Sequence, residues 1–435
     1  MREILRQKVV DSLAWTPPRL TRRDVHVPDV PGRAVAVIGP RRAGKTTFLW
    51  QLLLERMARG TPRERLLYLS FEDERLAGIE SSHLQTVVDE YYALHPGLRD
   101  QRRTTWFLDE IQAVPGWERF ARRIMDSERI ELFLSGSSAR LLSREVATSM
   151  RGRAVEALVY PFSFREFLRH RGREPDRPAR RLPKAGRSAL QRDLQEYLQS
   201  GGFPEVQGLG ARDRVDVLRG LVDVALLRDV IERHRVTHPV ALRSMARHLL
   251  ANAAGLFSVN RFYRDLRSQG IPVAKDTLHA YLAHLEDAFL VRSVPVAAAS
   301  ERRRMVNPRK VFPIDPGLLP VFDRTGRANL GHALETAVLL ALDRRGAHVS
   351  YVRTRGGREV DFLARYPGEG LSLIQVCAQA EGEALERELR ALQEAAREHP
   401  RATLHLITLE PGPVEVPAGV ALHRAWEWLM DAPGA

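Results

Sequence analysis

VAVIGPRRAGKTT, residues 35–47, joins an apolar run to a glycine-rich loop and then to a helical pattern. Glycines let a loop turn its backbone N–H groups toward phosphate oxygens without a Cβ in the way. A helix that begins near Lys45 would direct the positive end of its dipole at the same phosphates. The order of strand, G-x-x-x-x-G-K-T loop and helix therefore predicts an ATP site. The predicted ATP-binding residues are Gly39, Pro40, Arg41, Arg42, Ala43, Gly44, Lys45, Thr46 and Thr47.

Two side chains of the loop and two that follow later in the sequence are predicted to act on the nucleotide. We expect Lys45 to reach the β- and γ-phosphates and Thr46 to hold Mg²⁺. A second apolar run ends in Asp109 and Glu110. Asp109 is predicted to bind Mg²⁺ with Thr46, and Glu110 to polarise the attacking water, so that hydrolysis and not only binding is the natural interpretation.

A third apolar run is followed by Ser135-Gly136-Ser137-Ser138. A strand that ends in small polar residues can position the water beside the γ-phosphate. Ser137 is therefore predicted to take this catalytic sensor role, with an ordinary turn after a strand as the alternative.

The rest of the first 160 residues fits the same architecture. Short apolar runs at 35–39, 66–71, 104–109 and 130–135 predict buried strands, and 45–58 and 117–127 predict helices between them. Apolar strands with intervening helices are typical of a parallel sheet in an α/β layer.

Composition narrows the class of protein. The chain has 435 residues and a formal net charge of +13, with 62 Arg and only five Lys, which are Lys8, Lys45, Lys184, Lys275 and Lys310. Excess basic charge favours a polyanionic partner, usually nucleic acid. Coding bias toward Arg is the alternative. A scarce lysine is informative, because an ammonium fits a phosphate loop as a point charge where a guanidinium fork would be too broad.

Other features point to the cytosol. The single cysteine, Cys377, excludes an internal disulfide and a multi-cysteine zinc site. Apolar runs are far shorter than the roughly 20 residues of a membrane helix, and the first residues lack the apolar core of a secretory signal. We expect a cytoplasmic protein with no membrane contact.

With these motifs in order, the chain resembles a prokaryotic family of AAA+ ATPases that joins an AAA+ module to a C-terminal domain of unknown function with a degenerate restriction-endonuclease-like fold. The resemblance implies an arginine finger at Arg151 or Arg153, of which we favour Arg153, with Arg228 as a weaker candidate and an ordinary helix or linker arginine as the alternative. The segments that carry the resemblance are VIGPRRAGKTT, YLSFEDERL, WFLDEIQ, LFLSGSSARLLSRE, MRGRAVEALVYPFSFREFL, YLQSGGFPEV, LLRDVIERHRV, KVFPIDPGLL and GREVDFLA.

The expected fold class is α/β, with a P-loop AAA+ parallel-sheet core, a helical lid, a winged-helix region and a C-terminal nuclease-like α/β domain. The expected boundaries are a lead segment at 1–30, the AAA+ core at 31–170, the lid at 188–236, the winged helix at 237–305 and the nuclease-like domain at 306–435. Within the last part we expect helices at 331–345 and 382–398 and strands at 348–353, 359–364, 371–377 and 403–408.

Residues 240–300 predict a module that contacts DNA. A helix from Lys275 to Phe289 would enter a major groove, with Lys275 and Thr277 near its start. Arg292 and Arg302–Arg304 would contact phosphates. Use of the same winged helix for protein packing is the alternative.

The C-terminal part matches the nuclease pattern incompletely. Glu335, Asp361 and Gln375 correspond to the metal-binding helix Glu, Asp and Glu/Gln, but Cys377 stands where a lysine orients water. Coding bias would replace that lysine by arginine. A thiol supplies no fixed positive charge, so we predict an inactive nuclease, and a second metal site at Glu335, Asp361 and Gln375 stays open.

Our main hypothesis is an ATP hydrolase, with ATP and Mg²⁺ as cofactors, that remodels or translocates on duplex or branched DNA. It would act as a homo-oligomer, for which a hexameric ring is one arrangement. One alternative is an ATP-gated switch or scaffold with slow turnover. The other is an ATP-dependent nuclease.

Overall fold

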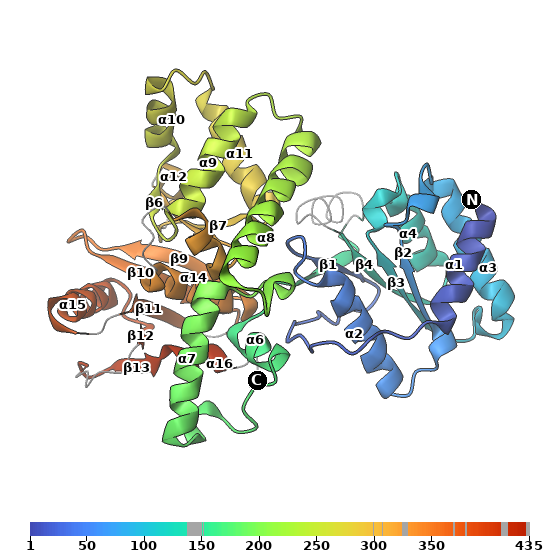
Figure 1. Ribbon diagram of the computed structural model, residues 1–435, viewed down its shortest axis with the longest axis horizontal. Coiled ribbons are helices and arrows are strands. Elements are labelled where there is room, and N and C mark those ends of the chain that lie inside the picture. Colours follow the sequence, from blue (N-terminus) through green and yellow to red (C-terminus); the bar gives the residue numbers. More distant parts are fainter. Residues whose placement is uncertain are drawn as a thin grey trace. The chain divides into compact units, whose positions relative to one another are not determined.

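The computed structural model describes residues 1–136, 150, 152–298, 300–306, 308–323, 329–368, 370–378, 381–409 and 416–431. The chain divides into two compact units, Met1–Tyr160 and Pro161–Ala435 (Figure 1). The division lies ten residues before the end of the AAA+ core that the sequence analysis expects at residue 170.

The first unit is built on a five-stranded parallel sheet with the order β2-β3-β4-β1-β5. All four predicted strands are confirmed. The last strand was not predicted, because Glu156 interrupts its short apolar pattern. The strands are β1 (Ala34–Ile38), β2 (Leu66–Ser70), β3 (Thr104–Asp109), β4 (Ile130–Ser135) and β5 (Ala154–Leu158).

The helices of this unit include both predicted ones. They are α1 (Arg2–Ala14), α2 (Lys45–Ala58), α3 (Leu84–Leu94) and α4 (Trp117–Ser127), with short 3₁₀ turns at Arg63–Arg65, Glu74–Leu76, Ser81–His83, Pro96–Leu98 and Ile111–Ala113. The segment 1–30 is more than a lead, because α1 packs against α3 and β2 and buries Leu5 and Val9.

The parallel sheet gathers the functional residues at one edge. Neighbouring parallel strands end on the same side, so the phosphate loop after β1, Asp109 at the end of β3 and Ser135 at the end of β4 share that edge. Ligands of open α/β sheets bind at the carboxyl ends of the strands. The topology alone therefore brings the predicted site together.

The second unit begins with helices. These are α6 (Phe164–His170), α7 (Lys184–Ser200) and α8 (Ala211–Val224), which continues as a π-helix over Ala225–Glu232, with 3₁₀ turns at Ala179–Arg181 and Pro204–Val206. α7 begins within residues 171–187, where Leu182 is the only large apolar residue, because Leu190 and Leu194 then bury one face of the helix.

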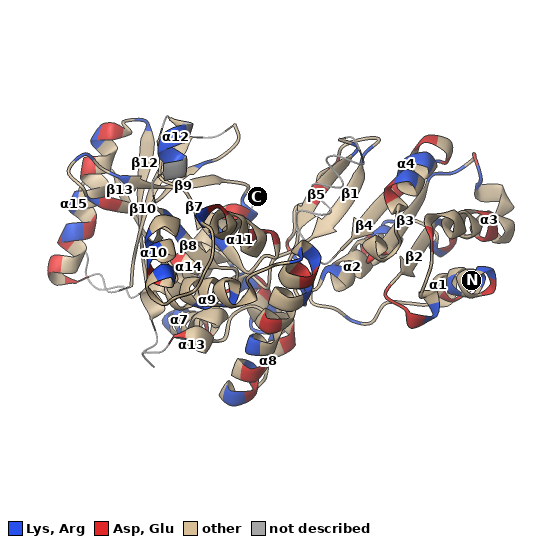
Figure 2. Cartoon of the chain, turned by 90° about the horizontal axis from the view of Figure 1, so that it is seen from above, with Lys and Arg blue, Asp and Glu red and all other residues tan. Residues whose placement is uncertain are grey.

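Next comes a three-stranded antiparallel sheet with the order β6-β8-β7 and the helices around it. The third strand lies beyond the boundary expected at residue 305. Exposed Arg302, Arg303 and Arg304 lie on the short α12, which Figure 2 shows in blue. The elements are α9 (Pro239–Ala251), β6 (Leu256–Phe257), α10 (Val259–Ser268), α11 (Lys275–Asp287), β7 (Val291–Val294), α12 (Glu301–Val306) and β8 (Arg309–Pro313).

A second five-stranded sheet, with the order β13-β12-β11-β10-β9, forms the C-terminal part. β9, β10 and β11 pair antiparallel, whereas β11, β12 and β13 pair parallel. Each predicted helix and strand from residue 331 onward is confirmed to within about two residues. The elements are a 3₁₀ turn at Pro316–Leu318, α13 (Leu319–Phe322), α14 (Leu330–Arg344), β9 (His348–Arg353), β10 (Glu359–Arg365), β11 (Leu371–Cys377), α15 (Gly382–Glu398), β12 (Ala402–Thr408), β13 (Val420–Arg424) and α16 (Ala425–Met430).

A buried carboxylate joins two segments of this unit that are far apart in sequence. Asp315 accepts hydrogen bonds from the backbone N–H of Gly202 (2.7 Å) and of Gly317 (2.9 Å). A Cβ at Gly201 would lie 1.8 Å from a carboxylate oxygen of Asp315, and one at Gly202 would lie 2.1 Å from the carbonyl oxygen of Phe162. The two glycines are therefore required for this close approach.

Asp315 makes the stability of the second unit depend on pH. Burial raises the pKa of Asp315 to about 7, with the N–H groups of Gly202 and Gly317 opposing the rise. The folded state then binds more protons than the unfolded state between about pH 4 and 7, so stability falls as pH rises through that range, by on the order of 2–4 kcal/mol. Amide exchange of the peptides around 202 and 317, corrected for intrinsic rates, should show this fall. In Asp315→Asn the fall with pH should be smaller, although the variant is less stable throughout, and the part that remains includes the contribution of Glu335; an unchanged slope would contradict the assignment.

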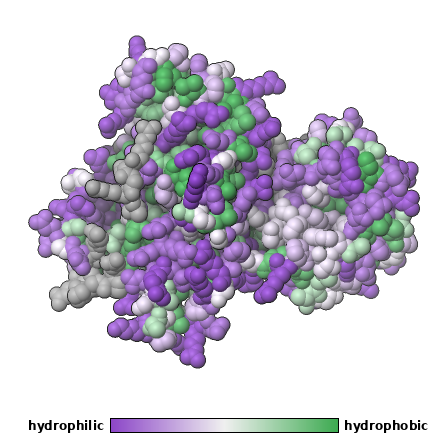
Figure 3. Space-filling model, viewed as in Figure 1, coloured by the Kyte–Doolittle hydropathy of each residue, from purple (hydrophilic) through white to green (hydrophobic). Residues whose placement is uncertain are grey.

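The visible surface is mostly hydrophilic, with scattered hydrophobic groups (Figure 3). Among the larger exposed apolar side chains are Val224, Leu227 and Val240. In the described parts of the chain, none of the helices combines the length and the apolar character that crossing a membrane requires.

Candidate functional site

The phosphate loop connects β1 to α2 and depends on two glycines. Gly39 has a φ of 149°, and an added Cβ would lie 2.1 Å from the carbonyl oxygen of Val159, so no other residue fits there. Gly44 has a φ of 95° and is the N-cap of α2. The loop thus leads directly into the N-terminus of α2, where the backbone N–H groups and the helix dipole favour an anion.

Lys45 is the first residue of α2 and is only 6% exposed. Its Nζ donates hydrogen bonds to the carbonyl oxygens of Gly39 (3.2 Å) and Pro40 (3.0 Å). The ammonium is therefore held against the loop, in reach of the space that the loop encircles. This placement agrees with its predicted role on the phosphates.

Asp109 is the centre of a network of hydroxyl groups. It accepts hydrogen bonds from Thr46 Oγ1 (2.8 Å), Tyr68 Oη (2.8 Å) and Ser135 Oγ. The structure thus brings together Thr46 and Asp109, the two predicted Mg²⁺ ligands. The sequence analysis assigned no role to Tyr68 or Ser135. The signal that could have found them is their position near the end of a strand that neighbours β3.

Mg²⁺ fits this pair of side chains. Hydroxyl and carboxylate oxygens are the donors that Mg²⁺ takes, together with waters and substrate phosphates. Thr46 and Asp109 would hold the ion, which when bound neutralises charge on the β- and γ-phosphates.

Glu110 follows the strand in a constrained conformation. Its φ is 52°, which is uncommon for a residue other than glycine, and its backbone N–H donates to Ser135 Oγ at 3.1 Å. The carboxylate accepts a hydrogen bond from Gln112 Nε2. Burial raises the pKa of Glu110, with Lys45 and Gln112 opposing the rise. A carboxylate with a raised pKa beside the phosphate loop is suited to accept a proton from water.

The remaining catalytic candidates are Ser137, Arg151, Arg153 and Arg228. Ser137 and Arg151 lie outside the described residues. Arg153 precedes β5, at the edge of the sheet opposite the phosphate loop, and is paired with Asp126. It therefore cannot reach a nucleotide bound to its own subunit. Arg228, on the π-helix, is exposed and pairs with Glu232 at 3.0 Å.

A second polar cluster lies in the C-terminal part, and a lysine is at its centre. Lys310, from β8, has its Nζ 2.8 Å from Asp361 Oδ1, 2.8 Å from Glu359 Oε1 and 3.5 Å from Glu335 Oε2. Burial would lower the pKa of Lys310, but Asp361 and Glu335 outweigh it and raise the pKa. Burial, followed by the charge of Asp361, raises the pKa of Glu335 well above its usual value.

This cluster contains the positive charge that the sequence around Cys377 lacks. That thiol is buried in an apolar cluster with Leu373 and Leu389, as expected of a residue that carries no charge. The positive charge nevertheless exists, because Lys310 supplies it from a strand more than 60 residues upstream. The nuclease motif places its lysine two residues after Gln375. A lysine on a strand of another sheet cannot be recognised from that spacing.

The residues predicted as a second metal site do not fit a divalent cation. Asp361 Oδ1 accepts from Lys310, and Oδ2 accepts from Gln375 Nε2 (2.9 Å) and the backbone N–H of Val376 (3.0 Å). Gln375 Nε2 also donates to Glu388 (2.7 Å). Among the described residues, no group of three or more His, Cys, Asp or Glu side chains is arranged to hold a metal ion. The ammonium of Lys310 already pairs with two of these residues, Asp361 and Glu335.

The region predicted to contact DNA exposes a mixed set of charges. On α11, Lys275 and Asp276 are exposed, and Thr277 is half-buried. Arg292 forms an ion pair with Asp343 at 3.1 Å, which competes with a contact to phosphate. Sequence reasoning missed the exposed arginines of α10, at positions 261, 264 and 267, which recur at helical spacing.

The fold and site define a P-loop protein of the AAA+ class. A family model described as an AAA domain matches residues 31–168, and one described as a domain of unknown function matches residues 191–328. The second match lies in the middle of the chain, not at the C-terminal end where the sequence analysis places such a domain. Among solved structures, the chain is similar to the Walker-type ATPase PABY2304 of Pyrococcus abyssi, with a TM-score of 0.42 and 17% identity, over 74% of this chain and 95% of that one.

Two curated relatives show the family. An uncharacterized protein of Methanocaldococcus jannaschii, MJ1544, is 30% identical over 385 residues, which cover 87% of this chain and 82% of the relative. An uncharacterized protein of Haemophilus influenzae is 30% identical over 334 residues, which cover 77% of this chain and 80% of the relative. The chain belongs to the family of MJ1544.

Proposed function

We propose that the chain binds ATP with Mg²⁺ at the phosphate loop and hydrolyses it. The observation that carries the proposal is the shared sheet edge at which Lys45, the Thr46–Asp109 pair and Glu110 meet. Lys45 and the loop N–H groups bind and orient the phosphates, and Glu110 takes a proton from water. Such positioning and charge stabilisation account for most catalysis of phosphoryl transfer.

We further propose that the chain uses ATP hydrolysis to remodel DNA or to move along it. Residues 239–313 would contact the DNA. The order α9, β6, α10, α11, β7, β8 with the sheet order β6-β8-β7 supports a winged helix. Exposed Arg261, Arg264 and Arg267 on α10, together with Arg302–Arg304 on α12, support contact with a phosphate backbone.

Removing the α10 arginines should weaken DNA binding and reduce its salt dependence. In Arg261→Gln/Arg264→Gln/Arg267→Gln, the slope of log K against log[salt] for a fluorescent duplex should fall by up to about 2.7, since each phosphate contact contributes about 0.9. DNA stimulation of ATP turnover should fall with it. A matched control removes three exposed arginines of the first unit, as Arg59→Gln/Arg102→Gln/Arg103→Gln, with the same change of net charge. Equal slopes in the two triple variants would refute the proposed role in DNA binding. So would a wild type that does not bind duplex DNA and whose ATP turnover is not stimulated by it.

We propose that the C-terminal part is nuclease-like in fold and inactive. The order α14, β9, β10, β11, α15, β12 supports the fold, and the pairing of Lys310 with three carboxylates supports inactivity. We also propose a homo-oligomer in which Arg153 is the arginine finger for the nucleotide of a neighbouring subunit. Its position at the opposite edge of the sheet keeps it away from the nucleotide of its own subunit.

A further inference from the structure

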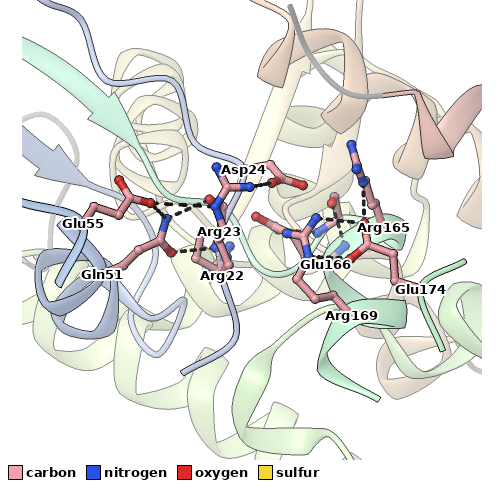
Figure 4. Close-up of polar contacts among 10 residues, drawn as sticks. Arg22, Arg23, Asp24, Gln51, Glu55, Arg165, Glu166, Arg169 and Glu174 are labelled. Carbon is pink, nitrogen blue, oxygen red and sulfur yellow. Dashed lines mark hydrogen bonds and ion pairs between the residues drawn. The ribbon is translucent and has the colours of Figure 1, made fainter. Parts of the chain in front are cut away.

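A buried arginine lies behind the phosphate loop. Arg23 belongs to the extended segment between α1 and β1 and is only 4% exposed. Its backbone N–H donates to Gln51 Oε1 (2.6 Å), and its carbonyl accepts from Gln51 Nε2 (3.0 Å). Gln51 Nε2 also donates to Glu55 (3.0 Å), so that α2 anchors the main chain of Arg23 (Figure 4). The same helix begins at the phosphate loop.

The guanidinium of Arg23 spans two backbone carbonyls. Nη1 donates to the carbonyl oxygen of Ala43 at 2.7 Å, and Nη2 donates to that of Tyr160. Ala43 is in the phosphate loop, and Tyr160 is the last residue of the first unit. Arginine is suited to this task because its planar fork presents several donors in fixed directions.

The contact with Ala43 fixes a peptide that would bind phosphate. In a planar trans peptide, the N–H of Gly44 points opposite to the C=O of Ala43. Ala43 lies between Arg42, with a φ of 60°, and Gly44, with a φ of 95°, so this peptide stands in a conformation that needs support. By holding the carbonyl on the outside of the loop, Arg23 turns the Gly44 N–H toward its inside.

The contact with Tyr160 is one of three contacts that hold residues 159–160, the last of the first unit, near the end of β1 and the loop. The N–H of Val159 donates to the carbonyl of Ile38 at 2.8 Å. The carbonyl of Val159 lies so close to Gly39 that only a glycine fits. Residues 159–160, after which the second unit begins, are therefore in direct contact with the end of β1, with Gly39 of the loop and with Arg23.

We propose that Arg23 is a positioning residue that sets the Ala43–Gly44 peptide for phosphate binding and couples the state of the loop to the Tyr160–Pro161 junction. This inference rests on the proposed ATP-binding function. Arg23 would then both set the shape of the nucleotide site and transmit the effect of nucleotide binding to residues 159–160.

The test measures nucleotide binding and junction exchange in the full chain. A non-hydrolysable ATP analogue with Mg²⁺ is titrated by calorimetry, and amide exchange of the peptide 158–164 is followed with and without it. In Arg23→Gln the Kd should rise about tenfold or more, and the nucleotide-dependent change at 158–164 should disappear. Arg23→Lys should recover part of the affinity. Arg22→Gln is the matched control, because Arg22 is exposed and pairs with Asp24 and Glu55, and it should match the wild type.

The outcomes separate this proposal from the proposed function. A folded Arg23→Gln that binds the analogue within twofold of wild type and keeps the exchange change overturns it. If Arg23→Gln does not fold, Arg23→Lys decides, and wild-type behaviour in both readouts overturns it. A wild type that binds the analogue without hydrolysing ATP refutes hydrolysis and leaves this test valid, whereas a wild type that does not bind refutes both.

Discussion

Glu110→Gln is expected to lower kcat for ATP hydrolysis by about 10²–10⁴, while the Kd for ATP stays within a few-fold of wild type. The amide keeps the size of the side chain and its hydrogen bond with Gln112 but cannot accept a proton from water. Lys45 and the loop, which we propose bind the phosphates, are untouched. Phosphate release and analogue titration on the same preparation separate the two effects.

Glu74→Gln provides the control, because Glu74 is an exposed carboxylate in the 3₁₀ turn after β2 whose loss changes the charge equally. It should retain wild-type kcat. If Glu110→Gln turns over like the wild type, another group takes the proton and the assigned role is wrong. If it loses ATP binding to the same extent as activity, Glu110 supports the shape of the site and is not the base.

Lys310→Met is expected to destabilise the second unit by about 3–5 kcal/mol, which is the cost of leaving buried charges without their partner. Asp361 and Glu359 each lie 2.8 Å from the ammonium, and no other cation in the described part of the cluster replaces it. Amide exchange of peptides from β10 and β11 reports the loss locally. Exchange in the first unit should be unchanged.

Two further variants sharpen this result. Lys310→Met/Asp361→Asn should recover part of the stability, because it removes one uncompensated charge. Lys184→Met, which removes an exposed lysine at the start of α7, should be neutral. A wild-type chain that cleaves DNA with Mn²⁺, and loses cleavage in Asp361→Ala, would contradict the assignment of Lys310 as the resident cation and restore the nuclease alternative.

The first unit could be predicted closely because its information is local. The motif at 39–47 and the apolar runs around it specify strand, loop and helix in succession, and parallel pairing then places Asp109 and Glu110 at the same edge. The roles proposed for these two carboxylates rest on residue type and order. β5 was not predicted, because an exposed Glu156 interrupts a strand whose hydrogen bonds to β1 hold it in the sheet.

What could not be predicted depends on contacts between distant segments. Arg23 is one arginine among 62, and nothing near it in the sequence marks it as the one that reaches Ala43 and Tyr160. Lys310 reaches Asp361 from another sheet, so reading the motif around Gln375 alone gave a site without a positive charge. Asp315 and Gly202 meet only after the second unit folds. Spacing in sequence carries none of this information.

Phosphate release by the purified full chain at saturating Mg²⁺-ATP tests the central claim most directly, with Glu110→Gln as the blank prepared in the same way. The proposed site predicts sustained release by the wild type that exceeds the blank by about 10² or more and that requires Mg²⁺. Release by the wild type no faster than that of the blank would contradict it.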